Sequence, residues 1–173
     1  MNFKIILTFL IIIFSSSAFS INIRVLDFQS IVENNINLPI LYDQINKDQE
    51  IHKNKLKNEE INLQDELKRI EELNLILEPI ELEKEIENYN TKLNNFNDKV
   101  EKFNLHYDLQ INNLKNKIIN IILEELKKYS ADNNIELILD SNNYILSSNS
   151  INITNLIQDE VNKINIEINF EKY

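Results

Sequence analysis

The chain has 173 residues but no glycine, no cysteine and no tryptophan, and it contains only two prolines. Phosphate-binding loops and dinucleotide fingerprints need glycine where the backbone approaches a phosphate, so the sequence excludes both kinds of site. The lack of cysteine excludes disulfides, thiolate nucleophiles and cysteine metal sites. Because the chain has no glycine, turns that need a positive φ must use asparagine or aspartate, and the chain is rich in asparagine.

The first twenty residues have the pattern of a signal peptide. Lys4 gives a positive start, residues 5–14 form an apolar run, and small residues follow at Ala18 and Ser20. An apolar run of about ten residues is too short to span a bilayer comfortably. We expect cleavage after Ser20, secretion into the periplasm, and no integral membrane insertion after cleavage. The alternative is an uncleaved membrane anchor.

Basic residues are scarce relative to acidic ones. The whole chain has 18 Lys and Arg against 28 Asp and Glu, a net charge of −10. Removal of residues 1–20 takes away Lys4 and no acidic residue, which leaves a net charge of −11. Nucleic acid and anionic membrane surfaces need a basic face, so neither is an expected partner.

The middle of the chain predicts two long helices in a hairpin. Residues 23–26 read as a strand, residues 28–32 as a short helix and residues 34–38 as a loop, with Pro39 in the first turn of the next helix. Pro79 breaks the helical pattern, which places the tip near residues 78–81. Apolar residues at helical spacing in the first helix are Leu56, Leu63, Leu67, Ile70 and Leu77.

The second helix has the strongest periodic signal. Its apolar residues alternate in steps of four and three, as in a coiled coil, at Leu82, Ile86, Tyr89, Leu93, Phe96, Val100, Phe103 and Tyr107. The apolar stripe then shifts and widens at Ile111, Leu114, Ile118, Ile121 and Ile122. We expect this end of the helix to enter a globular body.

The end of the chain predicts a small β element. After a polar loop at 129–134, residues 135–139 and 143–146 suggest a β-hairpin joined by an Asp-Ser-Asn-Asn turn, and Thr154 suggests the N-cap of a short amphipathic helix. Residues 164–170 alternate between apolar and polar and form either an extra strand or a frayed tail. The predicted core of this small body consists of Val25, Leu137, Leu139, Tyr144 and Leu146.

Three stretches resemble the Skp/OmpH family of periplasmic chaperones. They are residues 23–30, residues 129–140, and Asn152-Ile153-Thr154, where the family has Asp-Ile-Thr. The resemblance implies a homotrimer whose helical arms enclose unfolded outer-membrane proteins without using ATP or any cofactor. It also implies a fold that is mostly α, with a long antiparallel coiled-coil hairpin on a strand-containing trimerisation body.

The resemblance assigns residues 21–40 and 128–173 to the body and residues 41–127 to the arm. The chain departs from the family in two respects. Residues 43–108 carry 17 Asp and Glu against 10 Lys and Arg, a net charge of −7, whereas arms in the family are often basic. This puts in doubt the capture of acidic clients or lipopolysaccharide phosphates by ion pairs. The chain also continues further beyond Lys163 than the family leads us to expect.

The candidate functional residues are apolar, and none is catalytic. His52 and His106 stand alone, and neighbouring carboxylates such as Glu59 and Glu60 point apart on a helix, so we expect no enzyme activity and no metal site. The residues that we expect to contact a client are Ile76, Ile80, Phe96, Phe103 and Leu105. The alternative function is a structural coiled-coil envelope protein or adaptor without chaperone activity.

Overall fold

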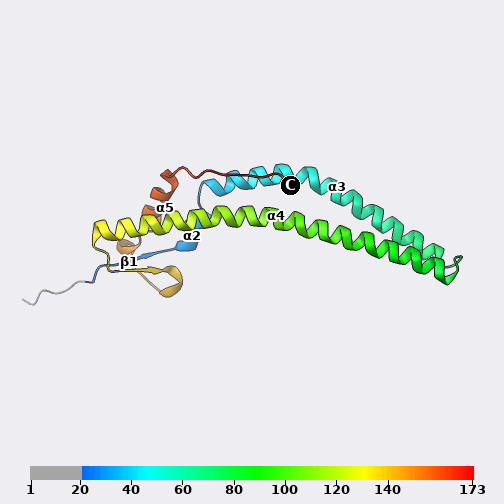
Figure 1. The fold of residues 1–173 in the computed structure, drawn as a ribbon. Helices are drawn as coiled ribbons and strands as arrows, with labels where there is room; N and C mark the ends of the chain where they lie inside the picture. The colour runs from blue at the N-terminus through cyan, green and yellow to red at the C-terminus, as the bar shows by residue number, and fades with distance from the viewer. Residues whose placement is uncertain (1–20) are drawn as a thin grey trace, which may run out of the picture.

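The computed structural model describes residues 21–173, so the predicted signal peptide lies outside the described residues. Two long helices form an arm that projects from a small body (Figure 1). The arm consists of α3 (Asn37–Leu73) and α4 (Pro79–Asn133). The body consists of β1 (Ile23–Leu26), α2 (Phe28–Glu33), β2 (Leu137–Asp140) and α5 (Thr154–Lys163). This is the mostly α fold with a helical hairpin that the sequence predicts.

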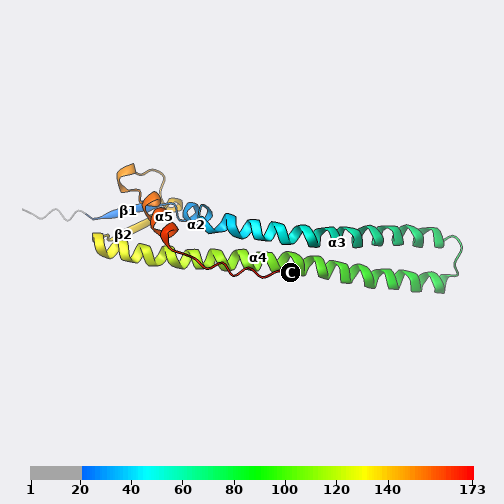
Figure 2. The same ribbon diagram turned by 90° about the horizontal axis from the view of Figure 1, so that it is seen from above.

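The two strands lie on either side of the arm in the sequence. They pair in parallel, with Ile23 opposite Leu137 and Leu26 opposite Asp140. An isolated bridge joins Val25 to Asn152 on the other side of β1. A parallel pair needs a crossover connection, and here the whole arm is that connection. The strands therefore fasten the two ends of the arm together, as Figure 2 shows from above.

The arm follows from the periodic pattern and its interruption at Pro79. Glu78 has extended backbone and Pro79 is the first helical residue of α4, where its missing N–H costs no hydrogen bond. The 37 residues of α3 correspond to about 55 Å at a rise of ~1.5 Å per residue. α4 ends before Asn134, whose φ of 51° is the one positive φ among residues 21–173. Asparagine thus takes the left-handed position that glycine usually fills.

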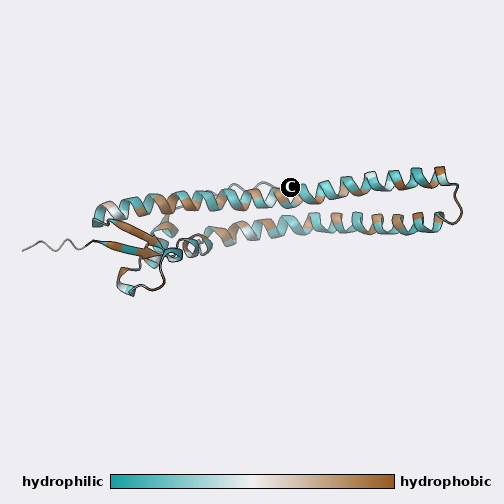
Figure 3. Cartoon of the chain, turned by 90° about the horizontal axis from the view of Figure 1, so that it is seen from below, coloured by the Kyte–Doolittle hydropathy of each residue, from teal (hydrophilic) through white to brown (hydrophobic). Residues whose placement is uncertain are grey.

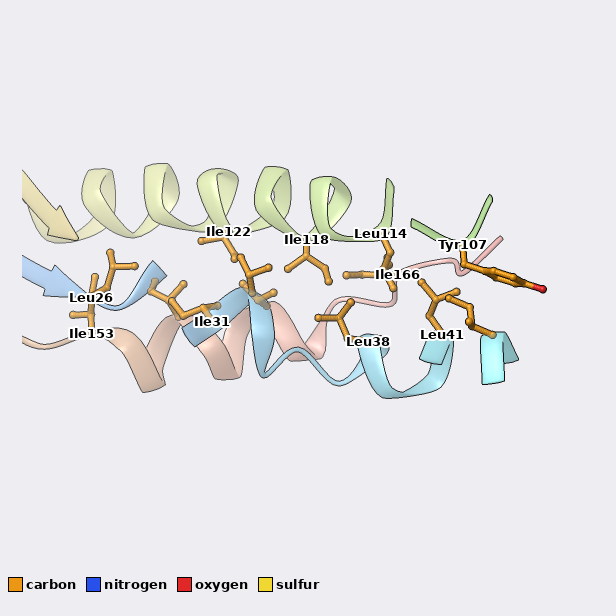
Figure 4. Packing of buried hydrophobic residues seen from close by; sticks show 14 of the residues in the cluster. Leu26, Ile31, Leu38, Leu41, Tyr107, Leu114, Ile118, Ile122, Ile153 and Ile166 are labelled. Carbon is orange, nitrogen blue, oxygen red and sulfur yellow. The ribbon is translucent and has the colours of Figure 1, made fainter. Parts of the chain in front are cut away.

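The main hydrophobic core lies where the base of the arm meets the body (Figure 4). Ile118 and Ile122 of α4 are fully buried, and Ile31 of α2 packs in the same cluster. The widened stripe of α4 therefore does enter a globular body. Beyond the body the arm carries many polar residues on both helices, with apolar residues interspersed among them (Figure 3). The other buried members of the cluster are Leu26, Val32, Leu38, Leu41, Ile45, Phe103, Tyr107, Leu114, Ile153, Ile157, Val161 and Ile166.

The predicted β-hairpin is wrong. β2 pairs only with β1 among the described residues, and residues 141–143 form a 3-10 turn. Tyr144 to Leu146 has no strand partner, and the backbone there follows an exposed loop. The predicted polar loop at 129–134 is also wrong, because α4 continues to Asn133.

The predicted N-cap role of Thr154 is wrong as well. Thr154 is the first residue of α5, and its Oγ1 accepts a hydrogen bond from the Asp27 N–H at 2.9 Å. The N-cap residue is Ile153, and Asn152, just before it, accepts a hydrogen bond from the Thr154 N–H through Oδ1 at 2.9 Å. Thr154 therefore joins α5 to the start of α2 and does not cap its own helix.

The last ten residues, 164–173, which we call the tail, are neither a strand nor a frayed end. They run back from α5 along α3 and α4 and end near the middle of the arm (Figures 1 and 2). Ile166 is buried in the main cluster, and Ile168 and Phe170 pack against it. Alternation in the tail therefore places one set of side chains on the helices while the other set faces outward.

Candidate functional site

Apolar side chains are exposed at the tip of the arm. Ile76 and Ile80 are 78% and 77% exposed, and Leu75 lies beside them in the connection between α3 and α4. Leu105, on α4, is also about half exposed. Three of the predicted client-contact residues are therefore accessible to another molecule.

Phe96 and Phe103 lie differently from the other predicted contact residues. Phe96 is half-buried on the seam of the arm, and Phe103 is buried. The Phe103 ring stands edge-on to Tyr107, with centroids 5.1 Å apart, and edge-on to Tyr173 at 5.3 Å. His52 and His106 complete this aromatic cluster through edge-on contacts with Tyr173. A client could reach Phe103 only if the cluster opened.

A buried carboxylate lies beside the aromatic cluster. Asp48 Oδ2 accepts hydrogen bonds from the Tyr107 hydroxyl at 2.8 Å and from the Tyr173 N–H at 2.9 Å. Burial opposes ionisation of Asp48, but these two donors and the nearby positive charges outweigh it and hold its pKa below the usual value. Burial and the Asp48 charge together raise the pKa of Tyr107, so that its hydroxyl stays protonated as a donor.

A second carboxylate holds the two ends of the arm together in the body. Asp140 Oδ1, at the end of β2, accepts a hydrogen bond from the Phe28 N–H at 2.9 Å. This bond is the main reason why the pKa of Asp140 is low, and further hydrogen bonds from residues 141–142 add to it against the effect of burial. Asp27 caps α2 through the Ser30 N–H. The start of α2 is thus tied to both β2 and α5.

The body carries an open apolar groove beside the sheet. Its volume is about 730 Å³, and its lining residues are Leu26, Phe28, Leu123, Leu126, Lys127, Ser130, Ile138 and Asp140. On the neighbouring loop Ile145 and Leu146 are 104% and 90% exposed. Of the predicted body core, Val25 is buried, Leu139 and Tyr144 are half-buried, and Leu137 is half-exposed. The apolar surface of the body is therefore only partly covered in the single chain.

Ion pairs cross between the helices of the arm. Arg69 pairs with Glu85 at 3.0 Å, and Lys92 pairs with Glu66 at 2.7 Å. The basic partners are more than half exposed, so each pair contributes roughly 0–1 kcal/mol to stability. The pairs bridge the two helices, and most acidic residues of the described chain make no salt bridge.

Clusters of metal ligands and membrane-spanning helices are both missing from residues 21–173. Within residues 21–173 no group of three or more His, Cys, Asp or Glu side chains is placed to hold a metal ion. No helix in that range is both long and apolar enough to cross a bilayer.

The sequence pattern gave partial signals for the residues that organise the site. Asp48 follows Leu41 and Ile45 in steps of four and three, so its position on the buried seam was readable. Its pairing with Tyr107 and with the end of the chain was not readable, because those contacts span 59 and 125 residues. For Asp140 the sequence indicated a turn but not the hydrogen bond from the Phe28 N–H.

Comparisons with known proteins show a likeness in structure. No protein-family model matches the sequence, and no curated protein matches it. One similar solved structure is that of an OmpH-like protein from Caulobacter crescentus, described as a candidate outer membrane chaperone. The two structures superpose with a TM-score of 0.65 at 12% sequence identity, over 87% of this chain and 89% of the other. The chain therefore has the fold of an OmpH-like protein.

Proposed function

We propose that the mature chain is an ATP-independent holdase chaperone of the periplasm that binds unfolded outer-membrane proteins between the arms of a homotrimer. The observation that carries this proposal is the combination of a long solvated arm bearing exposed apolar side chains with a body whose apolar surface is left open. The OmpH-like fold and the terminal sequence motifs agree with it.

The arm suits weak and repeated contact with an unfolded chain. Ile76 and Ile80 at the tip and Leu105 further along offer small apolar surfaces separated by charged, solvated residues. No single surface of this kind holds a client tightly. Several arms acting together raise the effective concentration of such contacts, so that a mobile client is held without being folded.

The body supports self-association. A two-stranded sheet is marginal in water, and parallel sheets are normally covered on both faces. Here the sheet borders an open apolar groove, and Ile145 and Leu146 point into solvent on the adjacent loop. Further copies of the chain would cover these surfaces, and the family resemblance supports three copies.

The sequence offers no phosphate-binding loop, because it contains no glycine. Capture and release therefore depend on competition between binding surfaces, and a client leaves when another surface binds it more tightly.

The direct test is native mass spectrometry of residues 21–173, alone and after mixing with a urea-unfolded outer-membrane barrel, together with light scattering of the diluted barrel. We expect a trimer that takes up one unfolded chain and suppresses its aggregation. The variant Ile76→Asp/Ile80→Asp should suppress aggregation less well, whereas Asn74→Asp, which changes the same tip without removing apolar surface, should match the wild type. A monomer or dimer that ignores the barrel would support the structural coiled-coil alternative.

A further inference from the structure

We propose that the groove between α3 and α4 at the base of the arm is a peptide site that recognises extended backbone, and that the tail occupies it as an intramolecular stand-in for a client. The ligand would be an extended segment whose apolar side chains alternate with polar ones. The proposed function supplies the source of such segments, because strands of outer-membrane barrels have this pattern. The inference rests on the proposed function in that respect only.

Side chains of the groove form hydrogen bonds with the backbone of the tail. Gln110 pairs with a single residue in both directions: its Oε1 accepts from the Glu171 N–H at 2.8 Å, and its Nε2 donates to the Glu171 carbonyl at 2.9 Å. Lys117 Nζ donates to the Glu167 carbonyl at 3.2 Å, and Asp48 accepts from the Tyr173 N–H. Every extended peptide carries such N–H and C=O groups, so these contacts do not select a sequence.

The apolar contacts require only alternation. Ile166, Ile168 and Phe170 pack toward the helices, and the intervening residues 167 and 169 face away from the main cluster. Another segment with apolar residues at every second position would present its side chains in the same way. The groove therefore specifies a conformation and a pattern.

The tail does not fill the groove. A cavity of about 460 Å³ remains beside residues 167–171, and its walls include the amide side chains of Asn113, Asn116 and Asn120. A second cavity, of about 340 Å³, lies beside Phe170. Gln44 lines this second cavity, and its Oε1 is buried without a hydrogen-bond partner among residues 21–173. The groove thus has room for larger side chains and unused groups for a further backbone contact.

The tail is held in a way that permits exchange. The hydrogen bonds from Gln110 and Lys117 lie at the solvent-exposed edge of the arm, where water competes with them. Residues 171 and 172 are exposed, whereas Tyr173 is held by Asp48 and by the aromatic cluster. A client segment that makes the same backbone contacts can displace the tail from the solvent-exposed edge, where Gln110 and Lys117 hold it.

The test uses the full mature chain and a labelled peptide with the sequence of residues 164–173, with binding followed by fluorescence anisotropy. The variant Ile168→Asp/Phe170→Asp should release the tail and bind the peptide at least about tenfold more tightly than the wild type, because the intramolecular competitor is gone. Asn74→Asp adds a negative charge at the tip, away from the tail, and should bind like the wild type.

A modified peptide separates backbone recognition from side-chain recognition. N-methylation at the position of Glu171 removes the N–H that donates a hydrogen bond to Gln110 Oε1. This change should weaken binding to the Ile168→Asp/Phe170→Asp chain, the release variant, by about tenfold. N-methylation at Asn169, whose N–H has no protein partner within residues 21–173, is the matched control. Equal binding of the two methylated peptides, or a release variant that binds no better than wild type, would overturn the inference.

Hydrogen exchange on the wild-type chain gives a readout that needs no variant. The Glu171 and Tyr173 amides should be protected, and an unfolded barrel should increase their exchange while the amides of α5 stay unchanged. If the chain suppresses aggregation but these amides do not respond and the peptide does not bind, this inference fails and the proposed function stands. If the peptide binds but the unfolded barrel does not, the proposed function fails, and the inference that the groove binds extended peptides stands.

Discussion

The hydrogen bond between Tyr107 and Asp48 is the contact whose removal is most informative. Tyr107→Phe deletes one hydroxyl and leaves the ring in the aromatic cluster. Asp48 then keeps only the Tyr173 N–H as a donor to Oδ2. A hydrogen bond to a charged group contributes about 1.5–3 kcal/mol, so we expect the free energy of unfolding at pH 7 to fall by that amount.

The effect of this substitution should depend on pH in a defined direction. The pKa of folded Asp48 is lowered, so its ionised form stabilises the fold above the unfolded pKa of about 3.9, and this contribution is lost as the pH falls through the lowered value. Tyr107→Phe removes one cause of the lowering. The difference between variant and wild type should therefore shrink as the pH falls below the unfolded pKa, and it should disappear below the lowered pKa, where the carboxyl is neutral in both.

The assay is urea unfolding followed by far-UV circular dichroism, at one fixed protomer concentration because association affects apparent stability. Tyr89→Phe is the matched control, since Tyr89 lies on the same helix and its hydroxyl has no hydrogen-bond partner within residues 21–173. A Tyr107→Phe variant within about 0.5 kcal/mol of the wild type at pH 7 would refute the reasoning. An equal loss at pH 7 and below the lowered pKa would show that the carboxylate is not involved.

Four further outcomes follow from the fold. Ile118→Ala should lower the free energy of unfolding by about 2–5 kcal/mol in urea titrations, because the side chain is fully buried. Ile145→Asp/Leu146→Asp should lower the mass of the assembly in sedimentation experiments while helicity stays unchanged. An assembly of unaltered mass would show that the contact between copies lies elsewhere. Asp140→Ala should destabilise the chain by about 1–2 kcal/mol at pH 7, and by less below about pH 3, by removing the acceptor of the Phe28 N–H. Client affinity should be unchanged or slightly higher as salt is raised, and a steep loss would show that ion pairs dominate.

The arm was predictable because its determinants are local. Steps of four and three residues along α4 mark a buried stripe, and the break at Pro79 places the turn between two helices of suitable length. The burial of Leu114, Ile118 and Ile122 where the stripe widens follows from the same pattern. A periodic signal repeated over many turns outweighs an error at any single position.

The body was less predictable because its contacts join distant parts of the chain. Residues 143–146 have the composition of a strand, but a strand also needs an adjacent partner, and β2 is already paired with β1. From the Asn-Ile-Thr motif we predicted the start of α5 correctly but gave the capping role to Thr154. Both Asn152 and Thr154 have side-chain oxygens that could accept a backbone N–H. Composition cannot choose between two neighbouring acceptors.

The tail was the least predictable element. Its alternation of apolar and polar residues suggested a strand or a frayed tail, and it is neither. Its actual contacts come from side chains on a helix, such as Gln110, and a polar residue on a helical surface carries no signal that it will bind backbone. Such contacts become visible only when the two segments are placed side by side.

The parallel pairing of β1 with β2 has a consequence for how the chain folds. Ile23 and Leu137 are separated by more than a hundred residues, so direct closure of that loop would be slow. Because helix formation is local and fast, we expect α3 to pair with α4 from the Pro79 turn first and the two strands to meet last. Substitutions at the turn should therefore slow refolding more than they speed unfolding, whereas substitutions in the sheet should mainly speed unfolding.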